Sequence, residues 1–251
     1  MGSSHFPNQL ELPAYNLSAK RVTRFLLSVI AILIILNLSE RFFIRWLNAT
    51  NGTELISRYF NFDQESNLPT LYSALTLGFC SYLLAIITTL RKAQNARYIK
   101  HWKGLSIIFS LMAIDEMCSY HELLIPILRE ALNAEGIFYF TWVIPGFFLV
   151  GIFLISYRKF IFNLPPKTRN LFILAGAVYL SGTLGMEMVG GYLADRSGYN
   201  TVYGLASTTE ELFEMFGIVI FINGLLSYIQ SQLNELHLSL RFKSRSNKAS
   251  L

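Results

Sequence analysis

Long apolar stretches alternate with short polar connections along this 251-residue chain. A helix that crosses the hydrocarbon core of a membrane needs about 20 mostly apolar residues. Six stretches reach that length, and the pattern predicts six membrane-spanning helices, at residues 22–47, 70–90, 102–124, 137–157, 170–194 and 211–233. We therefore expect an all-α fold, a polytopic membrane helix bundle.

The polar segments between and around these stretches are short, which indicates a single integral-membrane domain over residues 1–251. Residues 1–21 and 234–251 would flank the bundle, the second as a basic tail. The connection at 125–133 has the pattern of a short amphipathic helix lying along the membrane interface. Pro126 is expected to kink or break the span that precedes it.

Charged residues make up only 15% of the chain, against about 25% in soluble domains. Most of the 21 Lys and Arg fall on alternate connections: before the first span, between the second and third, between the fourth and fifth, and after the sixth. Cytoplasmic loops of membrane proteins carry such an excess. The pattern predicts an integral protein of the bacterial cytoplasmic membrane with both termini in the cytoplasm.

The same basic loops are expected to hold anionic lipid headgroups. Because topology already accounts for these charges, nucleic-acid binding is excluded as their explanation. Cys80 and Cys118 lie inside predicted spans and form neither a disulfide framework nor a cysteine metal motif, so packing is their expected role.

Acidic residues inside the predicted spans are the unusual feature, because a charged side chain in a membrane costs from about 3 to more than 10 kcal/mol. In the third span Asp115 and Glu122 share a helical stripe with Cys118 and Ser119, while Glu116 and His121 flank it.

The fifth span carries Glu187 on a face of small residues, and such a face favours close packing between helices. In the sixth span Glu211 and Glu214 share one side. There Thr208 or Thr209 would cap the helix, which would make Glu210 and Glu211 solvated acids of its first turn.

Several carboxylates at one depth repel one another unless they hold protons, pair with Arg or bind a cation. The pattern favours a cation or metal site with six ligands or proton carriers: Asp115, Glu116, Glu122, Glu187, Glu211 and Glu214. His121 and Glu116 are the candidate catalytic acid–base groups. With one histidine among so many carboxylates, the expected cofactor is a harder divalent metal, Fe, Mn, Mg or Ca, and not zinc.

Three functions remain open on these residues. One is a membrane-embedded, metal-dependent enzyme acting on a lipid-like substrate, and the second is a cation- or proton-coupled transporter of small solutes. The third is an assembly or scaffold protein whose acids only pair with Arg41, Arg45 and Arg129. The segment at Glu210 and Glu211 loosely resembles the first motif of membrane-embedded CAAX-type proteases, but Met215 replaces its arginine and the histidine motifs are missing, so this family is rejected.

Overall fold

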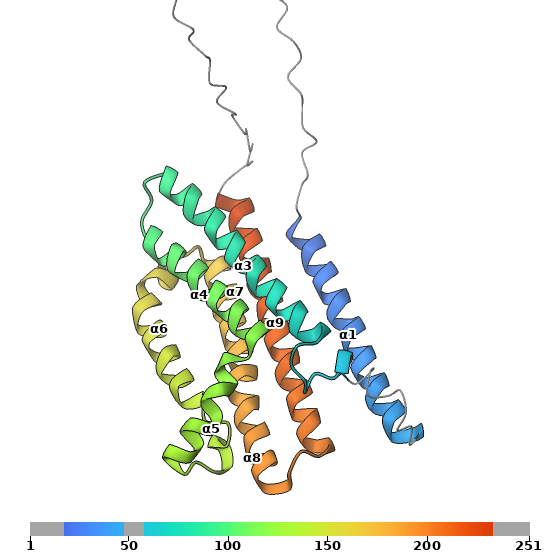
Figure 1. The fold of residues 1–251 in the computed structure, drawn as a ribbon. Helices are drawn as coiled ribbons and strands as arrows, with labels where there is room; N and C mark the ends of the chain where they lie inside the picture. Colours follow the sequence, from blue (N-terminus) through green and yellow to red (C-terminus); the bar gives the residue numbers. More distant parts are fainter. Residues whose placement is uncertain (1–17, 48–57, 233–251) are drawn as a thin grey trace, which may run out of the picture.

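The computed structural model describes residues 18–47 and 58–232, without the side chains of 42–47. Every regular element in these residues is helical, as expected (Figure 1). The elements in chain order are α1 (Ala19–Leu47), α3 (Leu68–Ala93), α4 (Ile99–Cys118), α5 (Tyr120–Leu132), the 3₁₀ turn η1 (Gly136–Phe138), α6 (Val143–Asn163), α7 (Pro166–Leu180), the π-helical segment η2 (Ser181–Met186), α8 (Glu187–Ser197) and α9 (Thr201–Gln232).

Five described segments are long and apolar enough to cross a membrane, and they identify the chain as a multi-pass integral membrane protein. They are Ala19–Arg41, Leu68–Ala93, Val143–Asn163, Pro166–Ser197 and Thr201–Ser231. They correspond to the predicted first, second, fourth, fifth and sixth spans. Helix α4 also runs along the bundle, but it carries too many charged residues to count as an apolar span. The count of six spans therefore stays a prediction.

The predicted third span, 102–124, is broken, and the break lies elsewhere than expected. Helix α4 ends at Cys118, and Ser119 takes a left-handed conformation with φ 50° before α5 begins. Pro126 lies inside α5 and does not interrupt it. The expected interfacial helix at 125–133 is therefore the second half of a longer helix, and the acidic segment of the third span lies on both sides of a break.

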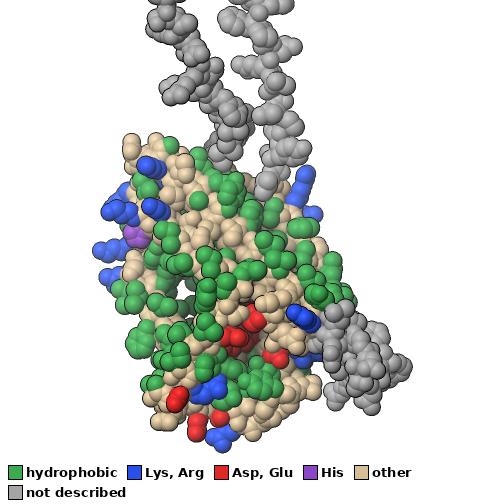
Figure 2. Space-filling model, in the orientation of Figure 1, with side chains coloured by type: hydrophobic (Ala, Val, Ile, Leu, Met, Phe, Trp, Pro, Cys, Tyr) green, Lys and Arg blue, Asp and Glu red, His purple; other side chains and the backbone are tan. Residues whose placement is uncertain are grey.

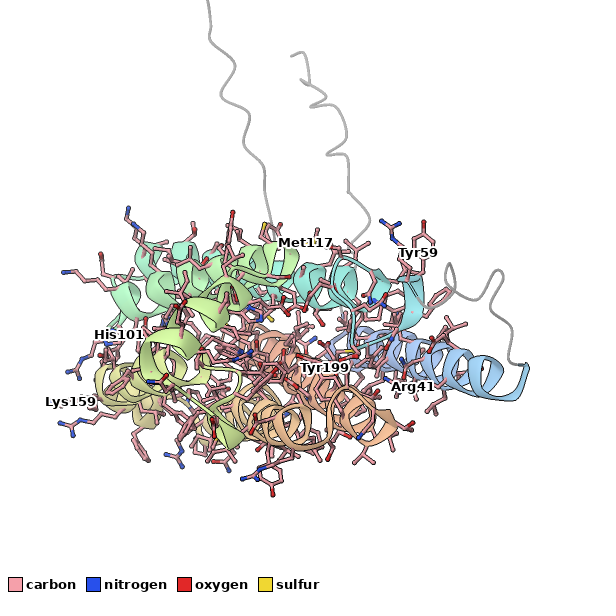
Figure 3. The ribbon with its side chains drawn as sticks, turned by 60° about the horizontal axis from the view of Figure 1, so that its bottom comes forward. Arg41, Tyr59, His101, Met117, Lys159 and Tyr199 are labelled. Carbon is pink, nitrogen blue, oxygen red and sulfur yellow. The ribbon has the colours of Figure 1, made fainter. Side chains whose placement is uncertain are left out.

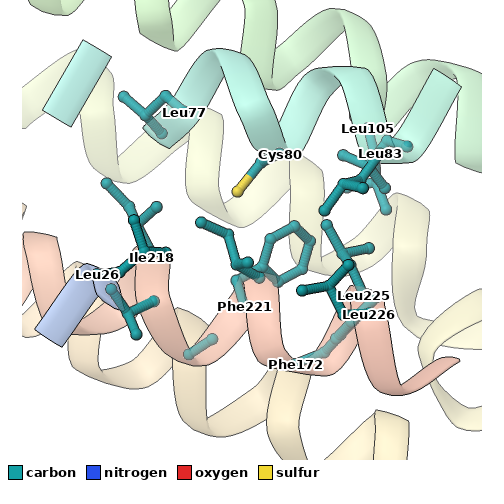
Figure 4. Close-up of a cluster of buried hydrophobic side chains, with 14 of the residues drawn as sticks. Leu26, Leu77, Cys80, Leu83, Leu105, Phe172, Ile218, Phe221, Leu225 and Leu226 are labelled. Carbon is teal, nitrogen blue, oxygen red and sulfur yellow. The ribbon is translucent and has the colours of Figure 1, made fainter. Parts of the chain in front are cut away.

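Helix α9 lies in the middle of the bundle and packs against α1, α3, α7 and α8. Its buried side chains Ile218, Phe221 and Leu225 lie with Cys80 of α3 in one apolar core (Figure 4). Cys80 is fully buried, as the packing role predicts, whereas Cys118 is exposed. Both thiols are free.

Glycines permit the closest approach of α7 to α9. A Cβ added at Gly217 would lie 2.7 Å from the Cβ of Tyr179, and one at Gly224 would lie 3.1 Å from the Phe172 ring. Both glycines therefore lie on the face of α9 that packs against α7. Gly176 of α7, in contrast, has no atom within 4 Å of an added Cβ.

Charges are separated along the bundle. The start of α1, the α3–α4 turn and the α6–α7 turn lie at one end of the bundle, and these segments carry most of the described basic residues (Figure 1). Figure 2 shows Lys and Arg at that end, and it shows the acidic side chains in the opposite half, where a few further basic side chains also lie. The direction in which the bundle crosses the membrane stays a prediction.

Candidate functional site

The acidic half of the bundle brings together residues from five parts of the chain, and we call them the acid cluster. Electrostatic interactions connect Glu116 with Glu214, Glu211 with Glu116, and His121 with Glu187. The members are Glu65, Asp115, Glu116, His121, Glu122, Glu187, Glu210, Glu211 and Glu214. All six predicted acids and His121 belong to it, whereas Glu65 and Glu210 were not among the predicted site residues.

Three members lie well inside α9 and not in its first turn. The helix begins at Thr201, where the side chain of Asn200 accepts hydrogen bonds from the backbone N–H groups of Val202 and Tyr203, at 2.9 and 3.1 Å. The predicted cap at Thr208 or Thr209 is therefore wrong. Both hydroxyls instead donate to backbone carbonyls one turn earlier in the helix. This removes the interpretation of Glu210 and Glu211 as solvated first-turn acids.

The π-helical segment η2 holds the fifth span against these acids. A Cβ at Gly182 would lie 2.7 Å from the carbonyl oxygen of Glu210 and 3.0 Å from Cγ of Glu214. The next residue, Thr183, makes a side-chain hydrogen bond with Glu214. Single π turns within α-helices are frequent at functional sites. Here the wider turn brings one face of η2 directly onto α9, just before Glu187.

Glu187 joins three helices at the start of α8. Its Oε1 accepts a hydrogen bond of 2.5 Å from the indole Nε1 of Trp142, at the start of α6. Its carboxyl group is also hydrogen-bonded to that of Glu210 on α9. An ionised carboxylate only accepts hydrogen bonds, so a bond between two carboxyl groups requires a proton on one of them. A contact of this kind between Glu187 and Glu210 forms when the two carboxyl groups share one proton.

Asp115 and His121 form a pair across the break between α4 and α5. Oδ2 of Asp115 lies 2.8 Å from Nδ1 of His121, and Oδ1 accepts the backbone N–H of His121 at 3.1 Å. The imidazole lies against the Trp142 ring, with the ring centres 4.9 Å apart. A carboxylate in this position orients an imidazole for proton transfer. The pair thus connects the break directly to Trp142 and Glu187.

Arg41 does not pair with the acid cluster, contrary to the scaffold hypothesis. Its guanidinium donates to the carbonyl oxygen of Gly204 at 2.9 Å and to the hydroxyl of Thr208 at 3.2 Å, which fastens α1 to α9. Arg129 donates to the carbonyl oxygen of Tyr139 at 2.8 Å and lies over its ring. Arg45 falls outside the described side chains. Among the side chains that the structure describes, His121 and Asp115 are the only pair of a basic and an acidic group within 4.0 Å.

The loop before α3 carries two acids outside the predicted site residues, Asp63 and Glu65, of which Glu65 belongs to the acid cluster. Asn67 ties this loop together by donating to the carbonyl oxygens of Asn61 and Gln64. Glu65 is hydrogen-bonded to Ser119, at the helix break, and desolvation and the charge of Glu122 raise its pKa. Desolvation likewise raises the pKa of Asp63, which bonds to Tyr203. In the sequence this loop is marked only as a polar segment between two apolar runs, and that pattern does not indicate that its acids approach the helix break.

Figure 3 shows the side chains with the acidic end brought forward. Tyr199 lies near the centre of this view, and Arg41 lies on α1 to one side. Met117, in the middle of the acidic segment of α4, is exposed at the outer edge. Its neighbours Asp115 and Glu116 are half-buried, so α4 turns its acids towards the bundle.

Metal ligation in particular requires at least three side chains that converge on one point. Across residues 18–41 and 58–232, no group of three or more His, Cys, Asp or Glu side chains is arranged to hold a metal ion. The acids share a region, but they do not form a coordination sphere. A metal site is therefore unsupported by the arrangement of the described side chains.

Comparison with known proteins gives a family but no activity. A family model described as a domain of unknown function (DUF8692) matches residues 26–229, which is well over half of the chain. No curated protein and no solved structure matches the chain.

Proposed function

The chain belongs to the DUF8692 family, and from that starting point we propose that it is a membrane-embedded acid–base enzyme. Its acid cluster would take up positive charge, as protons or as a bound cation, and act on a lipid-like substrate. The observation that carries this proposal is the crowding of carboxyl groups without contact to a described Lys or Arg. Such a cluster is stable in a membrane only when something else neutralises it.

Asp115 and His121 supply the acid–base part of the proposal. Asp115 orients the imidazole through Nδ1, which leaves Nε2 as the nitrogen that exchanges protons with a substrate. Glu116 would act beside His121 as a second proton carrier. Glu122, Glu187, Glu211 and Glu214 would hold the neutralising cation or protons. A divalent ion such as Fe, Mn, Mg or Ca remains a candidate that the following test includes.

Cation binding can be tested by thermal unfolding of the purified protein in detergent, with each divalent ion or with chelator. A ligand at 100 times its Kd stabilises the folded state by about 2.7 kcal/mol. Wild type should gain stability with one of these ions, whereas Glu211→Gln should lose the gain. Glu130→Gln is the matched control, because Glu130 is an exposed acid of α5 outside the acid cluster.

Proton storage is tested on the same samples by infrared spectroscopy. Protonated carboxyl groups absorb apart from ionised ones, and we expect wild type to show such a band at neutral pH. Glu210→Gln should reduce the band and Glu130→Gln should not. If no ion stabilises the protein and no protonated carboxyl is seen, the proposal is wrong.

Enzymatic activity is tested with proteoliposomes made from a total lipid extract of the expression host. Mass spectrometry should detect a lipid that changes with wild type and stays unchanged with His121→Gln. Glu130→Gln should behave as wild type. If the lipid profiles of wild type and His121→Gln are the same, the enzyme proposal does not hold for the lipids of that extract.

A proton- or cation-coupled transporter is the second candidate, and the interrupted helices favour it. Transporters often build substrate sites at discontinuous helices. Here α4 breaks at Ser119, and the fifth span contains η2, both beside the acid cluster. Proteoliposomes with a pH-sensitive dye inside would show flux that Glu187→Gln abolishes if this candidate is right.

A further inference from the structure

An apolar groove lies between α6 and the fifth span, on the side of the molecule that faces lipid. Phe147 and Val150 of α6 line it opposite Ala177, Leu184 and Gly185. Its volume is about 330 Å³, within the roughly 300–1,000 Å³ of small-molecule sites. Because α6 is an apolar span with most of its side chains exposed, the groove opens directly to the hydrocarbon of the membrane.

One end of the groove adjoins the acid cluster through Trp142. A Cβ at Gly146 would lie 3.1 Å from Cδ2 of Leu184 and 3.3 Å from Cζ3 of Trp142, so these side chains meet at one point. Leu184 lines the groove, and Trp142 donates its indole hydrogen bond to Glu187. The segment η2 thus presents Leu184 and Gly185 to the groove, whereas Gly182 lies against the acids of α9.

We infer that this groove holds the hydrocarbon chain of a membrane amphiphile whose amine headgroup lies at Trp142 and Glu187. The inference rests on the proposed function, because it names the substrate class of the same site. Two chemical properties select this occupant. The lining is apolar and opens to lipid, which suits an acyl chain, and the adjoining cluster is rich in carboxyl groups, which suits a positively charged ammonium head.

Two glycines of the same span, one in the groove and one outside it, provide a matched pair of variants. An added Cβ meets no atom within 4 Å at Gly185 or at Gly176, so a substitution at either position starts into open space. Gly185 lines the groove, whereas Gly176 on α7 does not. Gly185→Leu therefore fills the groove, and Gly176→Leu adds the same side chain to the same span outside it.

Binding can be measured by quenching of the protein's tryptophan fluorescence, and the part of the quenching that is lost in Trp142→Phe is assigned to Trp142 among the three tryptophans. The protein is placed in nanodiscs of unbrominated phosphatidylcholine and titrated with lysophosphatidylethanolamine that carries bromine on its chain. Lysophosphatidylglycerol with the same brominated chain is the headgroup control. We expect saturable quenching by the ethanolamine lipid, at least ten times weaker binding of the glycerol lipid, and loss of the saturable signal in Trp142→Phe.

Gly185→Leu should weaken binding of the ethanolamine lipid about tenfold or more, while Gly176→Leu should bind as wild type does. Equal binding by these two variants, or equal binding of the two headgroups, overturns the inference. Gly185→Leu changes no carboxyl group, so the cation and infrared tests of the acid cluster are independent of it. If the lipid-binding test fails while the cation or infrared test succeeds, only the amphiphile in the groove is rejected. If the cation and infrared tests both fail, the proposed function is rejected.

Discussion

Trp142 donates the hydrogen bond from its indole Nε1 to Oε1 of Glu187 over 2.5 Å, and this bond joins the start of α6 to the start of α8. At its other end α6 packs through Phe160 against Trp102 of α4, whereas Phe148, between the two ends, is 71% exposed. The bond therefore matters for the position of α6 as well as for the acid cluster.

Trp142→Phe is predicted to loosen α6, because it removes the donor and keeps most of the aromatic surface. Hydrogen bonds to charged groups contribute about 1.5–3 kcal/mol, so we expect a loss of stability of that order in thermal unfolding. Glu187→Gln keeps an acceptor oxygen at the same place and should lose less. Equal losses from the two substitutions would show that the indole bond does not hold the helix.

Gly217→Ala is predicted to destabilise the contact between α7 and α9. The new methyl group would lie 2.7–2.9 Å from the Cβ, N and Cα atoms of Tyr179, and backbone atoms cannot move aside cheaply. Overpacking of this kind costs about 1–3 kcal/mol. Gly78→Ala in α3 meets no atom within 4 Å and should stabilise its helix by about 0.5–1 kcal/mol. Thermal unfolding of the two variants should therefore shift in opposite directions.

Glu65→Gln is predicted to change the pH dependence of stability. Because the pKa of Glu65 is raised in the folded protein, folding favours its protonated form. That contribution is complete below the unfolded pKa and is lost as the pH rises through the folded pKa. The glutamine variant escapes this loss, so its melting temperature should exceed that of wild type at neutral pH, and the difference should shrink in acid.

Glu130→Gln is the control for this titration, and its melting curve should follow that of wild type at every pH. A constant difference between Glu65→Gln and wild type across the range would contradict a titrating Glu65. It would assign the effect of the substitution to the side-chain amide alone.

The apolar runs predicted the helices well, because a membrane leaves the backbone few alternatives to a helix. They also placed Asp115, Glu116, Glu187, Glu211 and Glu214 in one region, since these acids fall at similar depths on different spans. The local backbone conformations could not be predicted from the sequence. Periodicity cannot reveal a left-handed residue at Ser119 or a π turn before Glu187, because each depends on packing with a neighbouring helix.

Short polar segments were the other source of error. Thr208 and Thr209 have the composition of a helix cap, but Asn200 reaches the first free N–H groups earlier in the chain. Glu65 lies in a loop that Asn67 stabilises by a local hydrogen bond to Asn61, and its side chain bonds to Ser119 on a distant segment of the chain. Neither relation follows from residue spacing.

Membrane orientation is the last prediction, and it follows from the separation of charge. The positive-inside rule places the basic end, with Lys159 near the end of α6, in the cytoplasm. Ser197, at the end of α8, lies at the opposite end. Both side chains are exposed, so Lys159→Cys and Ser197→Cys can each report on access from water.

Each cysteine is introduced into a Cys118→Ser background, because Cys118 is exposed and Cys80 is buried. A membrane-impermeant maleimide should label Ser197→Cys in intact spheroplasts. It should label Lys159→Cys only after the membrane is opened, and the background protein in neither case. Labelling of Lys159→Cys alone in intact spheroplasts would reverse the orientation and put the acid cluster on the cytoplasmic side.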